Sequence, residues 1–239
     1  MKALILAAGM GSRLAPLTND YPKALVPVNG ESIIMKQIDN LHRNGIIDIT
    51  VVVGYKADMI TRAIKERYPD IHIIMNKEYS STNNMYSAYL GVKNMFQDVE
   101  FQPFLMMNAD VFFDASVIMS LVNDSNSNAI VVDIGKYMEE SMKVVEKNNR
   151  LVAISKQIAP EEALGCSIDV YKFDEEGGKT FFDKCVSYIE IKKEMNLWSE
   201  VALNDTLSEI IFKACPLKGR WLEIDNYEDL VAAEKLFSD

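Results

Sequence analysis

The chain has 239 residues, and 25 lysines and arginines stand against 35 aspartates and glutamates, which gives a formal net charge of −10. Hydrophobic residues make up 49% and charged residues 25%, which excludes a disordered chain, a collagen-like chain and a small disulfide scaffold. No apolar run reaches the roughly 20 residues that cross a bilayer, and the acidic balance argues against a nucleic-acid surface, so we expect neither a membrane nor a nucleic-acid partner.

The first part of the chain alternates strand and helix signals. A buried strand is predicted at residues 2–6, and a glycine-rich loop follows it. A helix then begins at Ile33 and ends at Gly45. Further strands are predicted at 48–53, 71–75, 103–107 and 128–133, and they alternate with helices at 57–67, 84–96 and 114–123. This order predicts an α/β fold with a Rossmann-like, doubly wound mixed sheet.

The rhythm changes after Gly135. The remaining predicted elements are strands at 142–146 and 150–155 joined by an Asn148-Asn149 turn, a strand at 165–173, helices at 175–194 and 199–213, a strand at 217–224 and a last helix capped by Asn226. We therefore predict a small antiparallel elaboration of one domain over 1–239. Its parts are a core at 1–135, an accessory hairpin region at 136–175 and a final part at 176–239.

The cysteines Cys166, Cys185 and Cys215 lie far apart, and the chain has no C-x-x-C pair. An odd number of cysteines without a pattern indicates reduced thiols, which are typical of a cytoplasmic protein.

The stretch from Leu6 to Arg13 is the most informative part of the sequence. A strand runs into a loop of small residues, whose backbone N–H groups can approach an anion closely. Arg13 adds a forked, permanently charged donor, and Lys23 adds a compact charge behind Pro22. The plainer interpretation is a glycine-rich turn that carries a surface arginine and lysine.

Residues 6–14, with Pro16-Leu-Thr18 and Pro22-Lys-Ala-Leu25, resemble the signature of sugar-phosphate and related nucleotidylyltransferases. The pattern is neither a dinucleotide G-x-G-x-x-G loop nor a Walker A loop. The resemblance implies that 1–135 is a nucleotide-binding core. It also implies two catalytic cations, with Arg13 on the departing β- and γ-phosphates and Lys23 near the reacting centre. The residues of the loop that this resemblance assigns to the nucleotide are Leu6, Ala8, Gly9, Gly11, Ser12, Arg13 and Lys23.

The family's metal carboxylates are matched by Asp110, after the apolar run 105–107, and by Asp225, after Trp221-Leu-Glu-Ile. Both carboxylates follow predicted strands, and Mg²⁺ prefers oxygen ligands and phosphate partners. The resemblance thus implies Mg²⁺ as cofactor, held by Asp110 and Asp225 in the core and in the final part of the chain. As an alternative, each aspartate is a helix cap.

A narrower resemblance lies in residues 76–89, which are similar to a stretch of cytidylyltransferases that act on phosphocholine, 2-aminoethylphosphonate and related small acceptors. It places Tyr79, Asn83, Asn84 and Ser87 at the nucleotide. Cytosine carries a donating exocyclic amine, so its recognition needs an acceptor such as a side-chain amide. The alternative is a polar loop in which Asn83 caps a helix.

The acceptor side is similar to the same enzymes at Met142-Lys-Val and Ile154-Ser-Lys156, and Lys156 is the candidate partner of the acceptor's phosphate. Trp198 and Glu200, aided by Glu223, suit a cationic head group through cation–π and charge attraction. Trp198 in the core is the alternative. Relatives often have G-E-x-I-G where this chain has Gly165-Cys-Ser-Ile-Asp169, so contacts there are expected to differ.

We hypothesise that an acceptor phosphate or phosphonate oxygen attacks the α-phosphorus of CTP and releases pyrophosphate. That oxygen is already an anion at pH 7, so alignment and charge neutralisation replace a general base. The expected partners are CTP and a small phospho-acceptor, with a homodimer left open, and the resemblance suggests capsule or cell-surface polysaccharide modification. The alternatives are a sugar-1-phosphate nucleotidylyltransferase that uses UTP or dTTP, and a non-catalytic regulatory homologue.

Overall fold

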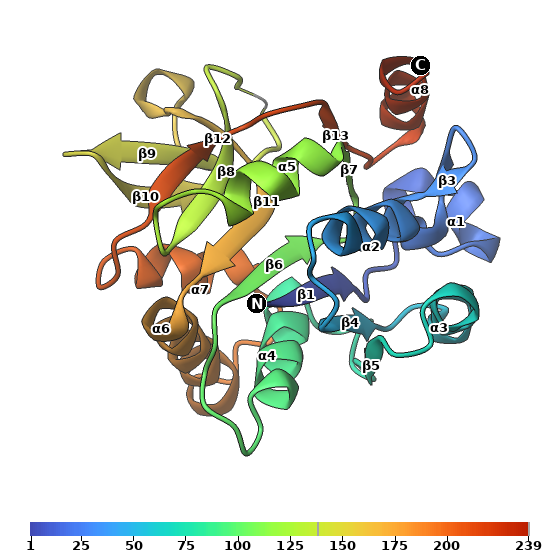
Figure 1. Cartoon of the computed structure of the whole chain (residues 1–239), viewed down its shortest axis with the longest axis horizontal. Coiled ribbons are helices and arrows are strands. Elements are labelled where there is room, and N and C mark those ends of the chain that lie inside the picture. The colour runs from blue at the N-terminus through green and yellow to red at the C-terminus, as the bar shows by residue number, and fades with distance from the viewer. Residues whose placement is uncertain (138, 239) are drawn as a thin grey trace.

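A mixed sheet forms the centre of the molecule (Figure 1). The computed structural model describes residues 1–137 and 139–238. Four parallel strands stand side by side in the order β6, β1, β4, β5. Their bounds are β1 Lys2–Ala7, β4 Ile49–Val53, β5 His72–Met75 and β6 Phe104–Asn108. The chain leaves β1 toward β4 on one side and later returns to β6 on the other, so the strand order reverses between β1 and β6.

The sheet continues beyond β6 with antiparallel strands. β11 pairs with β6 and also with β8 and β9, while β12 runs parallel to β8. The bounds are β8 Ala129–Ile134, β9 Lys143–Lys147, β10 Arg150–Ser155, β11 Gly165–Phe173 and β12 Lys213–Pro216. The predicted Rossmann-like mixed sheet with an antiparallel elaboration is confirmed.

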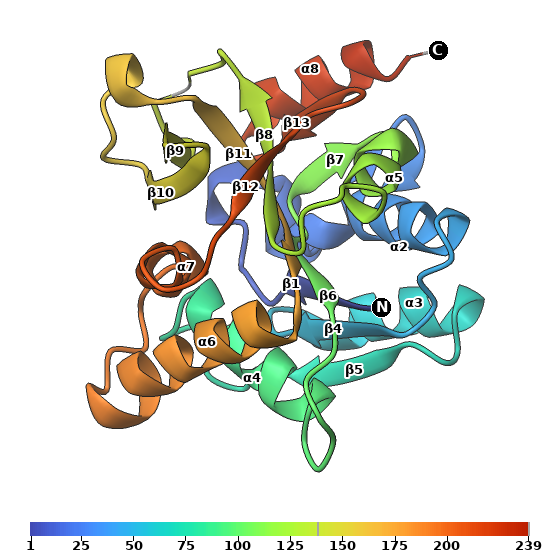
Figure 2. The same cartoon turned by 60° about the vertical axis from the view of Figure 1, so that its left-hand side comes forward.

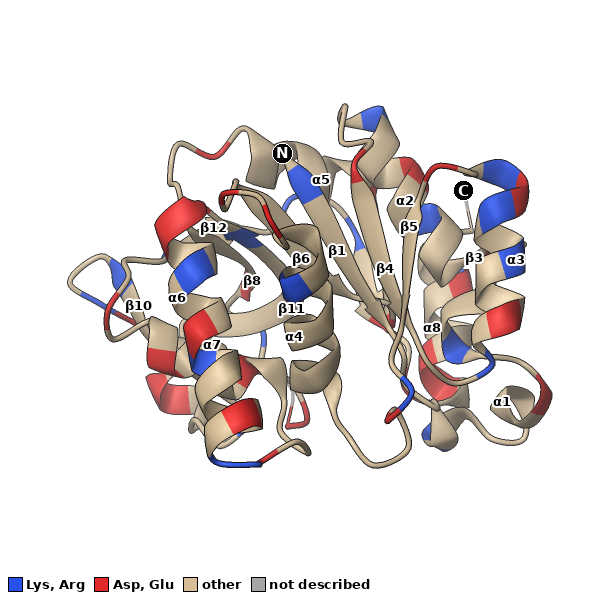
Figure 3. Cartoon of the chain, turned by 90° about the horizontal axis from the view of Figure 1, so that it is seen from below, with Lys and Arg blue, Asp and Glu red and all other residues tan. Residues whose placement is uncertain are grey.

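Helices cover both faces of the sheet (Figures 1 and 2). Alternate residues of β1 explain this arrangement, because Ala3 and Ile5 belong to one buried apolar cluster and Leu4 and Leu6 to another. The first cluster includes helices α2 (Ile33–Arg43), α3 (Ala57–Arg67) and α5 (Ala115–Val122). The second includes α4 (Asn84–Met95), α6 (Glu175–Val186) and α7 (Ser199–Thr206). Charged side chains lie mainly on helices and loops, and the central strands carry few (Figure 3).

A third apolar cluster joins the two ends of the chain. Leu14, Val26 and Ile33 pack with Ile224 and with Leu230 of the last helix. β2 (Pro27–Val28) and α8 (Tyr227–Leu236) contribute residues to this cluster. The short elements α1 (Leu17–Asp20) and β3 (Glu31–Ser32) lie in the same N-terminal stretch of the chain. Short 3-10 turns at Ser12–Leu14, Lys23–Leu25 and Pro160–Glu162 and a π-turn at Ser187–Ile191 complete the connections.

The predicted hairpin is confirmed. β9 and β10 pair antiparallel, and Asn148 and Asn149 have φ angles of 51° and 55°. Two consecutive left-handed residues are what a tight turn between twisted strands requires, and asparagine tolerates them.

Two predicted elements need correction, and one strand was not predicted. The helix at 199–213 ends at Thr206, and the strand at 217–224 shortens to β13 (Trp221–Glu223), while β12 lies before it at Lys213–Pro216 and pairs with a different strand. Gly219 between them has a φ of 106°, which breaks the extended run. The segment after Asp110 is also a strand, β7 (Val111–Phe113), and it pairs with β13.

The division into parts 1–135, 136–175 and 176–239 stays a prediction, and positions 138 and 239 lie outside the described residues. All three cysteines are buried and unbridged. Within the described ranges, every helix is too short or too polar to cross a bilayer.

Candidate active site

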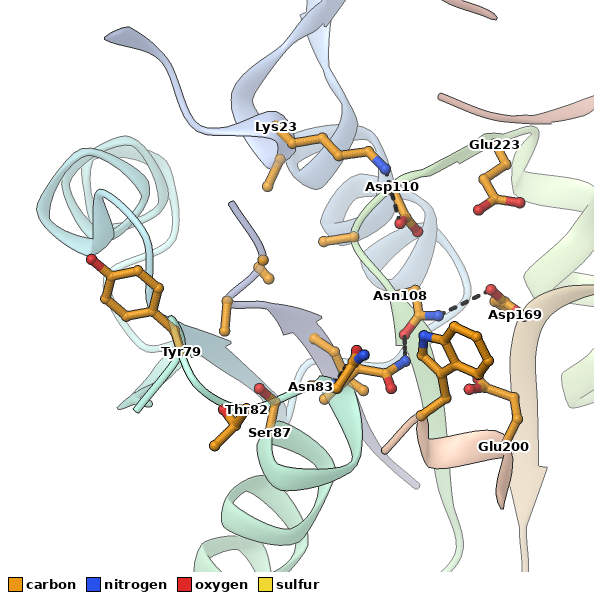
Figure 4. Close-up of a pocket in the computed structure, with 18 of the residues that line it drawn as sticks. Lys23, Tyr79, Thr82, Asn83, Ser87, Asn108, Asp110, Asp169, Glu200 and Glu223 are labelled. Carbon is orange, nitrogen blue, oxygen red and sulfur yellow. Dashed lines mark hydrogen bonds and ion pairs between the residues drawn. The ribbon is translucent and has the colours of Figure 1, made fainter. Parts of the chain in front are cut away.

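A pocket lies where the strand order reverses, at the carboxyl ends of β1 and β6. Open α/β sheets bind ligands at this place, because loops diverge there and leave a crevice. Tyr79 and Ser87 lie on one side of the pocket, Asp169 and Glu223 on the other, and Asp110 between them (Figure 4). Of the predicted site residues, the following line it: Leu6, Ala8, Gly9, Arg13, Lys23, Tyr79, Asn83, Asn84, Ser87, Asp110, Lys156, Trp198, Glu200 and Glu223.

Two predicted nucleotide-binding residues of the glycine loop, Gly11 and Ser12, are not among the residues that line the pocket. Gly11 has a φ of 62°, and a Cβ built there would lie 2.7 Å from Cβ of Lys23. Thr18 Oγ1 donates a hydrogen bond to the Gly11 carbonyl oxygen at 2.8 Å. Glycine is therefore required at position 11 for both its backbone conformation and its close approach to Lys23.

Lys23 joins the two predicted metal carboxylates. Its Nζ lies 3.0 Å from Oδ2 of Asp110 and 2.7 Å from Oδ1 of Asp225, and Arg13 Nη2 lies 2.8 Å from Oδ2 of Asp225. Burial lowers the pKa of Lys23, but the two carboxylates outweigh burial and leave the pKa above its ordinary value. Burial alone would raise the pKa of Asp225, but the positive charges of Lys23 and Arg13 outweigh burial and leave this pKa below its ordinary value. Both ion pairs therefore favour the charged forms of their partners.

The carboxylates Asp110, Glu223 and Asp225 have ligand atoms that all lie within 4.8 Å of one another. Oδ1 of Asp110 is buried without a hydrogen-bond partner among the described residues. Buried polar atoms normally have partners, and clustered carboxylate oxygens are the ligands that Mg²⁺ prefers. The residues present therefore fit a divalent metal. The helix-cap alternative does not explain them, because Asn226 caps α8 and Asp110 precedes a strand.

Gln37 of α2 holds the turn that carries Asp110. It is fully buried, and its Nε2 donates to the carbonyl oxygens of Asn108 and Val111, each at 2.8 Å. These carbonyls flank Asp110 on both sides. One helical turn further on, Asn40 Nδ2 donates to the Phe113 carbonyl at 2.8 Å. A buried amide thus fixes the backbone of the turn from outside the pocket.

The polar loop before α4 is organised by internal hydrogen bonds. Asn83 Oδ1 accepts from the Asn84 backbone N–H at 2.8 Å and caps α4, as the alternative interpretation predicted. The Asn84 amide donates to Asn108 Oδ1 at 3.3 Å and accepts from the Ser199 N–H at 2.8 Å. Ser87 Oγ accepts from Asn76 Nδ2 at 3.1 Å. Nucleotide contacts of these residues stay a prediction, and Asn84 also connects α4 to α7.

Asn108 and Asp169 line the pocket near the predicted residue Glu200, and neither they nor the neighbouring Tyr171 were among the predicted site residues. Tyr171 places its hydroxyl 2.9 Å from Asp169 Oδ1 and 2.8 Å from Glu200 Oε1, and Asn108 Nδ2 donates to Asp169 Oδ2 at 3.0 Å. Burial, followed by the charges of Glu200 and Asp110, raises the pKa of Asp169 to about 8. The only signal in the sequence is an aspartate where relatives often have the second glycine of G-E-x-I-G.

The predicted acceptor residues Lys156 and Trp198 touch each other. Lys156 Nζ lies 4.9 Å from the centre of the Trp198 ring, and 3.9 Å from Oε2 of Glu140. Trp198 is 43% exposed, so it is not a core residue. Burial, followed by the neighbouring carboxylates, raises the pKa of Glu223 to about 9. Lys156 and Trp198 therefore line the pocket as a contacting pair, together with the acidic residues Glu200 and Glu223.

Comparison with known proteins identifies the family of this chain. The model of the family described as nucleotidyl transferase matches residues 2–144, which include the glycine loop, Lys23 and Asp110. The chain belongs to the nucleotidyl transferase family. The predicted family membership is confirmed, as is the prediction that the protein is a nucleotidyltransferase enzyme.

This nucleotidyltransferase has relatives that match nearly its whole length and others that match part of it. It is 28% identical to a CTP:phosphoglutamine cytidylyltransferase of Campylobacter jejuni, over 96% of this chain and 98% of that protein. It is 47% identical to a choline-phosphate cytidylyltransferase of Streptococcus pneumoniae, over 38% of each chain. The solved structure of the CTP:phosphocholine cytidylyltransferase LicC of Streptococcus pneumoniae matches with a TM-score of 0.79 and 25% identity, over 98% of this chain and 97% of that one.

Proposed function

We propose that this nucleotidyltransferase is a Mg²⁺-dependent cytidylyltransferase that joins CTP to a small phosphorylated or phosphonate acceptor and releases pyrophosphate. One observation carries the proposal: the pocket joins a glycine loop and two cations to a carboxylate cluster, in a chain whose full-length relative is a CTP-dependent enzyme. Phosphocholine, 2-aminoethylphosphonate and phosphoglutamine are the acceptors to test.

In the reaction, an acceptor oxygen forms a new bond to the α-phosphorus of CTP. The bond between that phosphorus and the β-phosphate oxygen breaks, and its electron pair leaves with pyrophosphate. The two reactants are anions, so the residues must align them and reduce their repulsion. A divalent metal, when bound, neutralises charge on the phosphates.

The chain's own residues have separate tasks in this reaction. Ala8 and Gly9 of the loop line the pocket, and their backbone N–H groups are the candidates to bind the triphosphate. Arg13 holds the departing phosphates. The ammonium group of Lys23, which pairs with Asp110 and Asp225, would contact the reacting phosphate and offset its negative charge. Asp110 and Asp225 would hold the metal, with Glu223 close enough to join them. Lys156 at the rim is the candidate cation for the acceptor's phosphate.

A pyrophosphate-release screen tests the proposal. CTP, UTP, dTTP and ATP are each combined with the three acceptors above and with glucose 1-phosphate, with MgCl₂ or with excess EDTA. We expect release only with CTP, a small acceptor and the metal, and a product whose mass equals CMP joined to that acceptor. Release with UTP or dTTP and a sugar phosphate, and none with CTP, would identify the alternative sugar-1-phosphate enzyme. The Asp110→Asn variant controls for contaminating activity.

A further inference from the structure

Asn76 is a buried amide in the wall of the pocket, directly after β5. Its Oδ1 accepts a hydrogen bond from the Glu78 backbone N–H at 2.9 Å. A backbone N–H can only donate, so this contact fixes which way the amide group points. Nδ2 of Asn76 therefore faces the two hydroxyl groups beside it, and it donates to Thr82 Oγ1 at 3.2 Å and to Ser87 Oγ at 3.1 Å.

The orientation of Asn76 determines what the two hydroxyl groups can offer to a ligand. The Thr82 hydroxyl donates its single hydrogen to the Glu78 carbonyl oxygen at 2.8 Å, so Thr82 can only accept a further bond. Ser87 Oγ accepts from Asn76, and within the described part of the chain its own hydrogen has no acceptor. Ser87 therefore offers a donor. The two oxygens bond the same nitrogen, and they lie together on the side of the pocket that carries Tyr79 (Figure 4).

The amide oxygens that were predicted to accept from cytosine are used elsewhere. Asn83 Oδ1 accepts from the Asn84 N–H, and Asn84 Oδ1 accepts from the Ser199 N–H, each at 2.8 Å. These bonds cap α4 and join it to α7. The hydroxyl groups of Thr82 and Ser87 remain as a neighbouring acceptor and donor on this wall.

A neighbouring acceptor and donor match one edge of cytosine. Its exocyclic amine donates and the ring nitrogen beside the amine accepts, whereas uracil has an accepting oxygen and a donating ring N–H in the same places. Thr82 has no hydrogen for that oxygen of uracil, so an unpaired contact would weaken binding. Lys23 and Asp110, where the phosphates are expected, lie apart from Thr82 and Ser87, so this wall is left for the base (Figure 4).

We propose that Asn76 is a positioning residue for selection of the base. It fixes Thr82 as the acceptor for the amine of cytosine and Ser87 as the donor to the ring nitrogen, and the pocket therefore prefers CTP to UTP. This inference rests on the proposed function and explains how its nucleotide is chosen. Neither Asn76 nor Thr82 was among the predicted site residues.

Nucleotide binding without an acceptor substrate tests this inference, because no transfer can then occur. Calorimetry with MgCl₂ gives the Kd of CTP, of UTP and of two CTP analogues. One analogue, 3-deaza-CTP, lacks the accepting ring nitrogen, and the other, the pyrimidin-2-one triphosphate, lacks the amine.

Three variants change the hydrogen bonds on this wall one at a time. Thr82→Val removes the acceptor, Ser87→Ala removes the donor, and Asn76→Asp replaces the donating NH₂ group by an accepting oxygen. Ser81→Ala is the matched control, because Ser81 Oγ also donates to the Glu78 carbonyl, at 3.2 Å, but does not line the pocket.

We expect the native protein to bind CTP about tenfold or more tightly than UTP and than each analogue. Ser87→Ala should bind CTP and 3-deaza-CTP within twofold of each other, and Thr82→Val should do so for CTP and the pyrimidin-2-one triphosphate. Asn76→Asp should reduce the preference for CTP over UTP about tenfold. Ser81→Ala should keep every Kd within twofold.

A preference for CTP that survives in all three variants, or equal losses for CTP and UTP, would overturn this inference alone. Equal affinity of the native protein for CTP and UTP would overturn it too. If Asn76→Asp does not fold, the two hydroxyl variants and the analogues decide the question. A native protein that binds neither nucleotide would refute the proposed function as well.

Discussion

At the scale of single residues, Lys23 has the central position. Its ammonium contacts Asp110 and Asp225, which follow strands far apart in the sequence. Either carboxylate alone is a common surface feature, but a buried lysine between two of them concentrates charge at one point. Phosphoryl transfer between two anions depends on such concentrated charge.

Lys23→Ala should therefore abolish most of the turnover while the fold remains. Removal of one group that stabilises transition-state charge typically costs about 10²–10³ in kcat. Pyrophosphate release at saturating CTP and the circular dichroism spectrum are the two measurements. Lys36→Ala is the control, since Lys36 pairs with Glu31 outside the pocket. Near-normal turnover of Lys23→Ala would contradict the role assigned to this lysine.

Gly11 provides a second prediction at this scale. Gly11→Ala forces a Cβ against Lys23 and strains a backbone with a φ of 62°. Gly30→Ala has the same kind of strain, at a φ of 87°, but its Cβ meets no atom within 4 Å. Both variants should lose about 1 kcal/mol of unfolding free energy in urea titrations. Only Gly11→Ala should also lower kcat, and equal kinetics in the two variants would show that Lys23 tolerates the displacement.

At the scale of elements, helix α2 supports the turn between β6 and β7. Gln37→Met should release the carbonyls of Asn108 and Val111 and so loosen Asp110. We expect at least a tenfold rise in the Mn²⁺ concentration that half-saturates the protein, measured by calorimetry with a bound non-hydrolysable CTP analogue. Mutation of a group that positions a metal ligand typically costs about 10–100-fold in metal affinity.

Asn40→Leu is the matched control for this experiment. It also removes a buried amide from α2, but its partner is the Phe113 carbonyl, beyond the turn. Both variants should lower the melting temperature, because each leaves buried carbonyl groups without a donor. Equal loss of metal affinity in both would mean that α2 acts only through overall stability.

The elements also show how far the sequence predicts this structure. Strands and helices of the parallel half follow from local patterns, since β4 is a continuous β-branched run and α2 has an apolar face. β13 lies inside the predicted strand at 217–224, but β7 was not predicted, because its three residues are a strand only through their pairing with β13. The glycine loop, Lys23 and the two aspartates were recognisable by motif. Asp169, Tyr171 and Gln37 were not, because their roles depend on tertiary neighbours.

At the scale of the whole molecule, an ion pair connects the C-terminal segment to the core. Arg220 donates through Nε and Nη2 to both oxygens of Asp114, and through Nη1 to the Leu236 carbonyl at 3.0 Å. Partial burial raises the pKa of Asp114, but hydrogen bonds and charge from Arg220 outweigh burial and leave it below its ordinary value. The folded protein therefore favours the ionised form of this carboxyl.

Stability should depend on pH accordingly. A folded-state pKa below the unfolded value of about 3.9 stabilises the fold above that pH, and the stabilisation is lost as the pH falls through the folded-state value. Asp114→Asn should lower the unfolding free energy by about 1 kcal/mol at pH 7, since the pair is partly exposed, and by progressively less in acid. Urea unfolding at pH 7 and pH 3 measures the difference, with exposed Asp183→Asn as control. A difference that is constant over this range would rule out the ion pair as its cause.

The residues of the site are far apart in the sequence. They extend from Leu6, near the end of β1, to Asp225, just before α8. A nascent chain on the ribosome thus presents its phosphate-binding loop early and its last carboxylate late. Until β13 has emerged and paired with β7, Lys23 has only one of its two acidic partners. Translation itself therefore delays assembly of a competent catalytic centre until the chain has been made as far as Asp225.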